Sequence, residues 1–289
     1  MTFDAFLETA WNDHGDRPQE VADRLAASLH VVDHPDHIPP FARLVTHVFG
    51  EHLGQWRAGV DLLESLRGLP AFDGSAAAAG AVTRSAAALR HAGGDPAALD
   101  ALSPEDRVAA LAIAAAAFSG RGELKRAIAA YAESLHLAGA GFPPGSPALR
   151  ALAIGGNNLA AVLEDKKDRD AAETAGMVAA AEGGLKYWKL AGTWLEEERA
   201  LYRLARSLLQ AGEAARAVQS AQECLDVCRR NDAPAFERFF GCAVLALAHR
   251  AAGAAAAFAA ARDRALDLYA QVPENERQWC ASDLAELQG

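Results

Sequence analysis

Two groups of histidines and aspartates in the N-terminal third have side chains that could bind a metal ion. One short segment contains Asp33, His34, Asp36 and His37, and His47 and His52 follow it. Imidazole nitrogens and carboxylate oxygens are ligands for zinc in proteins. The segment lies in a proline-rich connector, however, and the sequence has no HExxH pattern or paired Cys-x-x-Cys spacing. A polar surface loop explains these residues better, so we expect no metal and no cofactor.

The cysteines are the second set of reactive side chains. Cys224 and Cys228 are one helical turn apart, and Cys242 opens the next expected helix, so the three thiols could cluster. Cys224 stands at an expected position for a small packing residue, which favours a buried, inert thiol over a ligand or redox switch. The sequence also has no GxSxG, P-loop or Rossmann glycine pattern. We therefore expect no catalytic residues and no enzymatic activity.

The composition restricts the partners and the compartment. The chain has 38 acidic and 28 basic residues and a net charge of −10. Nucleic acids and anionic membranes both favour a basic protein surface, so neither is expected as a partner. No stretch reaches the roughly 18 uninterrupted apolar residues of a membrane span, and the start does not resemble a signal peptide. With only four cysteines, we expect a cytoplasmic protein with reduced thiols.

Capping residues mark the helices that would position these side chains. Ser103 before Pro104 and two acids predicts a helix from 104 to 120, because the hydroxyl caps it and its dipole favours acids in the first turn. Thr193 with Glu196 forms a capping box that predicts a helix over 194–211. Apolar residues recur at spacings of three and four, which indicates about fourteen helices and no strands.

One spacing of small residues recurs four times in the C-terminal two-thirds of the chain. An alanine in one helix precedes a second packing residue by twelve positions in four pairs: Ala115 and Ala127, Ala160 and Ala172, Ala205 and Ala217, and Ala246 and Phe258. Small side chains let the two helices of a hairpin approach closely. Because one hairpin cannot bury its own apolar stripe, the spacing predicts stacked hairpins with a continuous core.

The order of residue types within each unit resembles the tetratricopeptide repeat (TPR). One unit reads Leu111, Ala114, Ala115, Phe118, Gly122, Ala127, Tyr131 and Ser134, and another reads Leu201, Leu204, Ala205, Leu208, Gly212, Ala217, Ala221 and Cys224. The second unit has Lys167 in place of the turn glycine and is expected to pack through Ala172 and Ala179. The period is longer than the 34-residue form. The resemblance implies an all-α fold, a right-handed superhelix (α-solenoid) of antiparallel helical hairpins.

We expect three segments along one continuous superhelix. Residues 1–100 form degenerate N-terminal helical hairpins, residues 101–272 form four TPR-like units, and residues 273–289 form a C-terminal capping helix. An apolar stripe around Phe3, Phe6 and Trp11 near the N-terminus is the expected contact if the chain forms a homodimer.

The resemblance also implies a set of ligand-binding residues. In TPR domains that bind the C-terminal carboxylate of chaperone tails, an asparagine and two basic residues stand at the positions of Asn158, Arg203 and Arg199. Two arginines one turn apart offer forked donors to a carboxylate or phosphate, and an asparagine can bind a peptide group. Asn157 and Tyr202 complete the expected set, Tyr202 as an apolar wall beside the ligand.

The alternative is that these two arginines are ordinary surface residues. The preceding repeat has Ala112 and Ala116 where the motif requires a lysine and an asparagine. Arginines on a solvated helix face usually pair with acids of the same helix, and the segment 196–198 supplies three glutamates.

Three classes of function remain open. The leading expectation is a non-enzymatic adaptor that binds a protein or peptide, with an acidic or C-terminal carboxylate group, in its concave groove. The alternative is a regulatory sensor that binds a small ligand or a signalling peptide. A helical enzyme or a metal-binding protein would require convergent carboxylates or a cluster of metal ligands.

Overall fold

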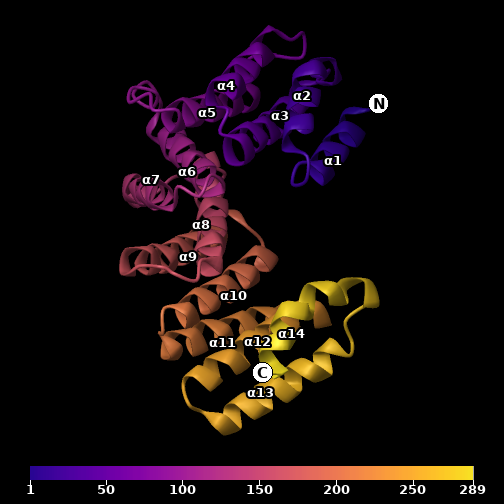
Figure 1. The fold of residues 1–289 in the computed structure, drawn as a ribbon, viewed down its shortest axis with the longest axis vertical. Helices are drawn as coiled ribbons and strands as arrows, with labels where there is room; N and C mark the ends of the chain where they lie inside the picture. Colours follow the sequence, from indigo (N-terminus) through magenta and orange to yellow (C-terminus); the bar gives the residue numbers. More distant parts are fainter. Residues whose placement is uncertain (289) are drawn as a thin grey trace. The chain divides into compact units, whose positions relative to one another are not determined.

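The computed structural model describes residues 1–288, and within them it contains fourteen α-helices and no strands (Figure 1). The expectation of an all-α fold is confirmed. The chain divides into two compact units, Met1–Gly155 and a second that begins at Gly156. The division falls inside a helix, whereas the segment boundaries expected at residues 100 and 272 stay predictions. None of the described helices is long and apolar enough to cross a lipid bilayer.

The first unit contains seven complete helices. They are α1 (Phe3–Asp13), α2 (Pro18–Ala27), α3 (Ile38–Val45), α4 (Trp56–Ser65), α5 (Ala76–Ala92), α6 (Pro104–Gly120) and α7 (Leu124–Leu137), with a π-helix (Thr46–Leu53) between α3 and α4. Helices α1 to α5 share one apolar core. Phe3 and Phe6 belong to this core and are 7% and 3% exposed. Trp11 is half-buried against the same core. The stripe expected to mediate a homodimer therefore packs within the unit, and homodimerisation stays a prediction.

The second unit contains a series of long helices and a short C-terminal one. They are α9 (Ala171–Ala191), α10 (Trp194–Gln210), α11 (Ala214–Arg230), α12 (Ala235–Ala251), α13 (Ala255–Tyr269) and α14 (Ala281–Gln288), and α8 (Pro147–Asp165) crosses the division between the units. The expected capping segment consists of a 3₁₀-helix (Glu274–Cys280) and α14, and its last residue lies outside the described range.

The capping residues begin the helices where the sequence predicts. The Ser103 hydroxyl accepts a hydrogen bond from the Asp106 amide at 3.1 Å, and α6 spans the predicted residues. The Glu196 carboxylate accepts a hydrogen bond from the Thr193 amide at 2.8 Å, and α10 begins directly after Thr193. The Thr193 hydroxyl also donates to Glu196. These local contacts satisfy backbone donors that the first helical turn leaves unpaired.

The small-residue positions of the repeat are buried between helices. Ala115, Ala160, Ala205 and Ala246 are each at most 1% exposed. Helices α6 and α7, α10 and α11, and α12 and α13 pack as hairpins. The prediction that alanine seams join helical hairpins is confirmed at these positions.

The second hairpin, α8 with α9, departs from the predicted spacing. Ala172 and Ala179 are exposed, whereas Met177, Ala180 and Ala181 of α9 are buried. The prediction of Ala172 and Ala179 as packing residues is therefore wrong. The loop before α9 spans 166–170, whereas the loops before α7 and α11 span only 121–123 and 211–213. The longer loop makes α9 begin later relative to Ala160, so its packing residues are shifted toward its C-terminus.

Candidate functional site

The predicted ligand-binding residues lie on two helices of the second unit. Asn157 and Asn158 belong to α8, and Arg199, Tyr202 and Arg203 belong to α10. Asn158 is exposed and Asn157 is half-buried, and within residues 1–288 neither asparagine side chain forms a hydrogen bond. The structure does not bring the asparagines into contact with the arginines, and each of the three α10 side chains binds a carboxylate of another helix.

Arg203 joins α10 to α8 through a buried carboxylate. Its Nη1 lies 2.5 Å from Oε2 of Glu164, and the Ser207 hydroxyl donates to Oε1 of Glu164 at 2.6 Å. The Glu164 side chain is only 8% exposed. Burial raises the pKa of Glu164 above its ordinary value, and the charge of Arg203 and the hydrogen bond from Ser207 oppose that rise. A buried carboxylate with two donors fixes the rotation of α10 against α8.

Arg199 joins α10 to α12 in the same way. Its Nη2 lies 2.6 Å from Oε1 of Glu237, and its Nε donates to Oε2 at 3.4 Å. The Glu237 side chain is 8% exposed, while that of Arg199 is 58% exposed. The two arginines thus pair with carboxylates 38 and 39 residues away. The sequence pattern had suggested same-helix acids as the alternative partners.

The inward side of α10 carries a buried acid beside two thiols. Glu198 is 1% exposed, and burial raises its pKa to about 9. Cys224 on α11 lies 3.1 Å from Oε1 of Glu198, and Cys228 lies close to both groups. A hydrogen bond with Cys228 and burial raise the pKa of the Cys224 thiol as well. Glu198 is therefore uncharged at neutral pH and Cys224 is a protonated thiol, whereas the hydrogen bond with Cys224 lowers the pKa of Cys228. Cys228 is only 1% exposed, so the cluster suits packing better than reaction with a molecule from solvent.

The C-terminal helix α14 packs against helices of the same unit and binds α10. The Tyr202 hydroxyl donates to Oδ1 of Asp283 at 2.7 Å. One turn later, Arg206 donates from Nη1 and Nη2 to the two carboxylate oxygens of Glu286, at 2.9 and 2.8 Å. Figure 1 shows α14 beside α12, with which it also packs. The 2% exposed Leu287 belongs to an apolar core shared with α12 and α13.

The candidate binding surface, which we call the α10 face, consists of Arg199, Tyr202, Arg203 and Arg206. Tyr202 and Arg206 contact α14, whereas Arg199 and Arg203 pair with acids of α12 and α8. The repeat pattern predicts the first three residues but not Arg206. The signal that could have found Arg206 is its spacing, because a tyrosine and an arginine four residues apart lie on one side of a helix. The sequence of 273–288 does not indicate that Asp283 and Glu286 bind α10, because their partners Tyr202 and Arg206 are about eighty residues earlier.

A pocket in the second unit concentrates positive charge. It has a volume of about 600 Å³ and is lined by residues of α11, α12 and α13, among them Arg229, Arg238 and Arg264. Arg229 pairs with Asp226 at 2.5 Å. Within the described residues neither Arg238 nor Arg264 forms an ion pair. We call this feature the arginine pocket, and guanidinium groups without carboxylate partners are suited to bind an anion.

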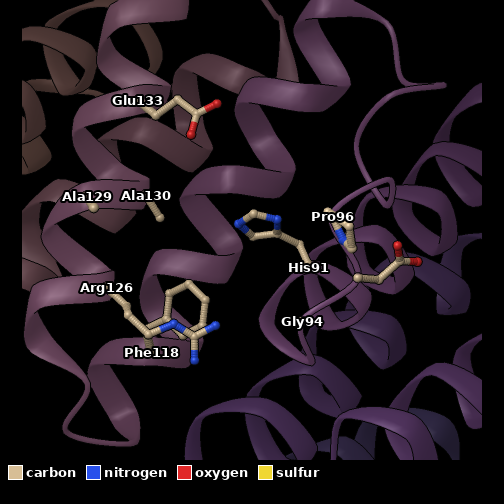
Figure 2. Close-up of a pocket in the computed structure, with 9 residues that line it drawn as sticks. His91, Gly94, Pro96, Phe118, Arg126, Ala129, Ala130 and Glu133 are labelled. Atoms are coloured by element: carbon tan, nitrogen blue, oxygen red, sulfur yellow. The ribbon is translucent and has the colours of Figure 1, made fainter.

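A pocket in the first unit has a different character (Figure 2). It measures about 360 Å³ and is lined by His91, Phe118, Arg126 and Glu133, with the Arg126 guanidinium 3.9 Å from the centre of the Phe118 ring. Burial lowers the pKa of His91, so the imidazole is neutral at pH 7. Arg126 pairs with Glu123, and Glu133 pairs with Arg107. Arg126 and Glu133 in this pocket thus already have partners.

Among known proteins, only solved structures resemble this chain. No family model and no curated protein matches the sequence. Among solved structures, the chain is similar to one described as Podosopora anserina kinesin light chain nearly identical TPR-like repeats. The identity is 15% and the TM-score 0.51, and the match covers 84% of this chain and 99% of that one. The chain is also similar to BtubC (BKLC) from P. vanneervenii, at 15% identity and a TM-score of 0.48, over 93% of this chain and 92% of that one.

The first of these similarities identifies the architecture. Its identity is too low to carry a function from one protein to the other, but the shared fold agrees with the buried alanine seams of the hairpins. The prediction from the repeat pattern is confirmed: this chain has the fold of the TPR-like helical-repeat proteins.

Proposed function

We propose that this protein is a non-enzymatic interaction scaffold that binds an acidic, amphipathic helical segment of a protein partner on the α10 face. TPR-like repeats generally serve as protein-interaction scaffolds. The observation that carries the proposal is the position of α14, an acidic amphipathic helix whose Asp283 and Glu286 bind Tyr202 and Arg206. The chain's own helix thus indicates the chemistry that the surface accepts. The four free, buried cysteines agree with a cytoplasmic protein, which is part of the proposal.

The α10 face combines two requirements of helix binding. An amphipathic helix places apolar side chains in a groove while polar groups at its edge fix its direction. In α14 the apolar part is Leu287, and the polar groups are two acids that accept a phenol and a forked guanidinium. We keep Arg199, which is largely exposed, and the other predicted residues Arg203, Asn157 and Asn158 in the proposed surface as contacts for a longer segment.

The proposal implies competition between the partner and α14. Because α14 is covalently attached, its effective concentration at the α10 face is in the millimolar range or higher. The apparent affinity of a free segment is then its intrinsic affinity multiplied by the fraction of molecules whose α14 is displaced, which is small in the wild type. A change that weakens α14 alone should therefore strengthen binding in trans.

The test uses a fluorescent synthetic peptide with the sequence of residues 273–288, titrated against the full chain by fluorescence anisotropy. In the Glu286→Lys variant, repulsion between Lys and Arg206 loosens α14 and opens the face. We expect this variant to bind the peptide at least about tenfold more tightly than the wild type does.

A second substitution locates the binding site. Adding Arg206→Ala to the Glu286→Lys variant should abolish the gain, because the peptide loses its forked donor. The matched control is Arg216→Ala on α11, where an exposed arginine pairs with Glu182 and Glu213 away from α14, and it should leave the gain intact. The proposal fails if the Glu286→Lys chain binds equally well with and without Arg206.

The arginine pocket favours a second candidate function, the sensing of a small anionic ligand. Arg238 and Arg264 are available there, and the pocket is large enough for a small polyanion. Thermal unfolding in citrate tests this candidate at constant ionic strength. Citrate should raise the midpoint for the wild type, and Arg264→Ala should remove the increase while Arg262→Ala, which pairs with Asp263, retains it. An equal shift in both variants would rule out a specific site.

A further inference from the structure

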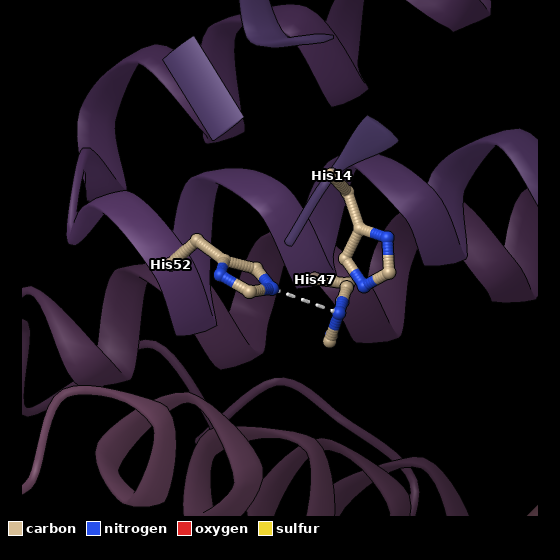
Figure 3. Close-up of side chains that lie close together, drawn as sticks. All are labelled: His14, His47 and His52. Carbon is tan, nitrogen blue, oxygen red and sulfur yellow. Dashed lines mark hydrogen bonds between the residues drawn. The ribbon is translucent and has the colours of Figure 1, made fainter. Parts of the chain in front are cut away.

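Three histidines of the first unit meet although they are distant in sequence. His14 caps the C-terminus of α1, and His47 and His52 lie on the π-helix. Figure 3 shows the three rings turned toward one another. One ring nitrogen from each lies within 4.8 Å of the other two, and the Nε2 atoms of His47 and His52 are 3.1 Å apart. The cluster shares no residue with the α10 face or with the segment 33–37.

The π-helix explains how His47 and His52 reach the same side. In an α-helix, residues five apart differ in direction by about 140° around the axis. The wider π-helical turn, with hydrogen bonds from i to i+5, reduces this angle, and such turns are frequent at functional sites. Just past the end of this π-helix, the Gln55 amide donates to the Phe49 carbonyl six residues earlier, at 2.8 Å. The unusual backbone thus produces the convergence of the rings.

Neighbouring acceptors orient two of the rings as ligands. Nδ1 of His47 lies 2.8 Å from the Glu51 carboxylate, and Nδ1 of His14 contacts the Trp11 carbonyl oxygen. A proton held on Nδ1 by such an acceptor leaves the lone pair on Nε2, which is the form that binds a metal. Carboxylate and carbonyl partners of this kind are typical of metal-binding histidines.

The site is held in place on the side away from α1. A Cβ on Gly120 would lie 2.7 Å from the Glu51 carbonyl oxygen, so α6 packs directly against the π-helix backbone. Arg121 also donates to the His52 carbonyl. Glu51 and Arg121 are the acid and the base that face the cluster. Burial lowers the pKa of His52, and the charges of His47 and His14 add to this effect. The Glu51 carboxylate raises the pKa of His52, and the Arg121 guanidinium lowers it.

We propose that His14, His47 and His52 form a binding site for a divalent transition-metal ion, with Zn²⁺ as the reference ion and one coordination position left to solvent. A tetrahedral ion with Zn–N bonds of about 2.1 Å separates its nitrogen ligands by about 3.4 Å. The closest pair of nitrogens, at 3.1 Å, is near this spacing, and small rotations of the rings would bring in the third. Imidazole nitrogens favour Zn²⁺, Cu²⁺ and Ni²⁺ over the oxygen-preferring Mg²⁺ and Ca²⁺.

The test titrates Zn²⁺ into the full-length, tag-free chain by isothermal titration calorimetry. We expect one equivalent to bind with a dissociation constant of about 1 µM or lower, and Mg²⁺ not to bind. His47→Ala should weaken binding at least about 100-fold, because two nitrogens cannot hold the ion as three do. His34→Ala is the matched control, since this exposed histidine lies in the same unit outside the cluster, and it should bind Zn²⁺ like the wild type.

A milder variant keeps the test decisive if His47→Ala does not fold. Glu51→Gln retains every ligand and weakens only the orientation of His47, so we expect about a tenfold loss of Zn²⁺ affinity with unchanged circular dichroism. Co²⁺ added to the wild type should give visible absorption bands that Zn²⁺ abolishes. Binding weaker than about 100 µM, or equal Zn²⁺ affinity in the wild type and the two cluster variants, would overturn the proposal.

Discussion

The two compact units of this chain hold their helices together by different means. In the first unit, α1 to α5 enclose one apolar cluster that includes the fully buried Leu25, Phe41 and Leu63. In the second unit, α10 is joined to α8, α12 and α14 by carboxylates that bind arginine, serine and tyrosine donors. Large apolar side chains contribute stability through the area they remove from water. Alanine seams remove less area per residue, so the polar pairs fix how the helices of the second unit are rotated.

This difference has a consequence for pH. Apolar burial does not titrate, whereas several acids of the second unit are buried and have raised pKa values. Above neutral pH we therefore expect the second unit to respond to pH and the first to depend mainly on packing, because the lowered pKa values of His52 and His91 in the first unit matter only at lower pH. The predictions below test that contrast, from the largest expected effect to the smallest.

Phe41→Ala tests the apolar core of the first unit. Removing a fully buried phenylalanine leaves a cavity, and we expect the free energy of unfolding to fall by about 3–5 kcal/mol in urea denaturation. The loss should be the same at pH 6 and pH 8. Phe72→Ala, at a half-buried position, is the control and should cost clearly less. A pH-dependent loss in Phe41→Ala would contradict the contrast between the units.

Glu198→Gln tests the buried acid of the second unit. The folded-state pKa of Glu198, about 9, is above its ordinary value of 4.5. The unfolded chain thus loses this proton first, and stability falls as pH rises from about 5 to about 9. One such group gives a slope of about 1.4 kcal/mol per pH unit. The Gln variant should reduce the slope by up to this amount in urea unfolding at several pH values.

Two features sharpen the pH experiment. Burial also raises the pKa values of Glu164 and Asp283, which act in the same direction, so part of the slope should survive in the Glu198→Gln variant. Glu197→Gln, beside it on the partly exposed side of α10, should leave the slope unchanged. An identical slope for the wild type and Glu198→Gln would contradict a raised pKa of Glu198 in the folded protein.

Gly184→Ala tests the close approach of α9 to α8. A Cβ at Gly184 would lie 2.9 Å from the backbone nitrogen of Asn157, and backbone cannot rotate away. We expect a loss of about 1–3 kcal/mol from this overpacking, measured by the midpoint of urea unfolding. Gly139→Ala, where a Cβ would meet nothing within 4 Å, should change stability by no more than about 0.5 kcal/mol. Equal effects would mean that α9 packs less closely against α8 than the structure indicates.

Tyr202→Phe tests the contact between α10 and α14. The variant removes one hydrogen bond to Asp283 and should cost about 0.5–1.5 kcal/mol in thermal or urea unfolding. Tyr269→Phe on α13 is the control, because that tyrosine packs through its ring against Phe239. If both substitutions have the same effect, the phenol of Tyr202 does not hold α14.

Much of the fold could be predicted because its signals are local or periodic. The caps at Ser103 and Thr193 act within one helical turn, so the sequence predicts the starts of α6 and α10 correctly. The alanine seams follow from a repeat that every hairpin must satisfy. The error at Ala172 and Ala179 has a simple origin, because a longer loop before α9 changes the spacing without changing the pattern inside either helix.

The candidate sites were less accessible from the sequence. The sequence pattern groups His47 and His52 with the segment 33–37 and does not include His14, because only the π-helix and the packing of α1 bring the three rings together. The pattern likewise predicts Arg199, Tyr202 and Arg203 as ligand-binding residues without indicating their partners on other helices. Those partners depend on which face each helix turns toward its neighbour.

The sequence by itself determined that the chain is helical, that the helices of its C-terminal part form hairpins, and that alanines separate them, because helix propensity, capping and periodicity act over a few residues. Only the tertiary structure decided which charged groups meet, as between Arg206 and Glu286 or among the three histidines. An ion pair forms only within a few ångströms. The rotation of each helix and the length of each loop therefore decide which residues pair, and one or two extra residues in a loop are enough to change the pairs.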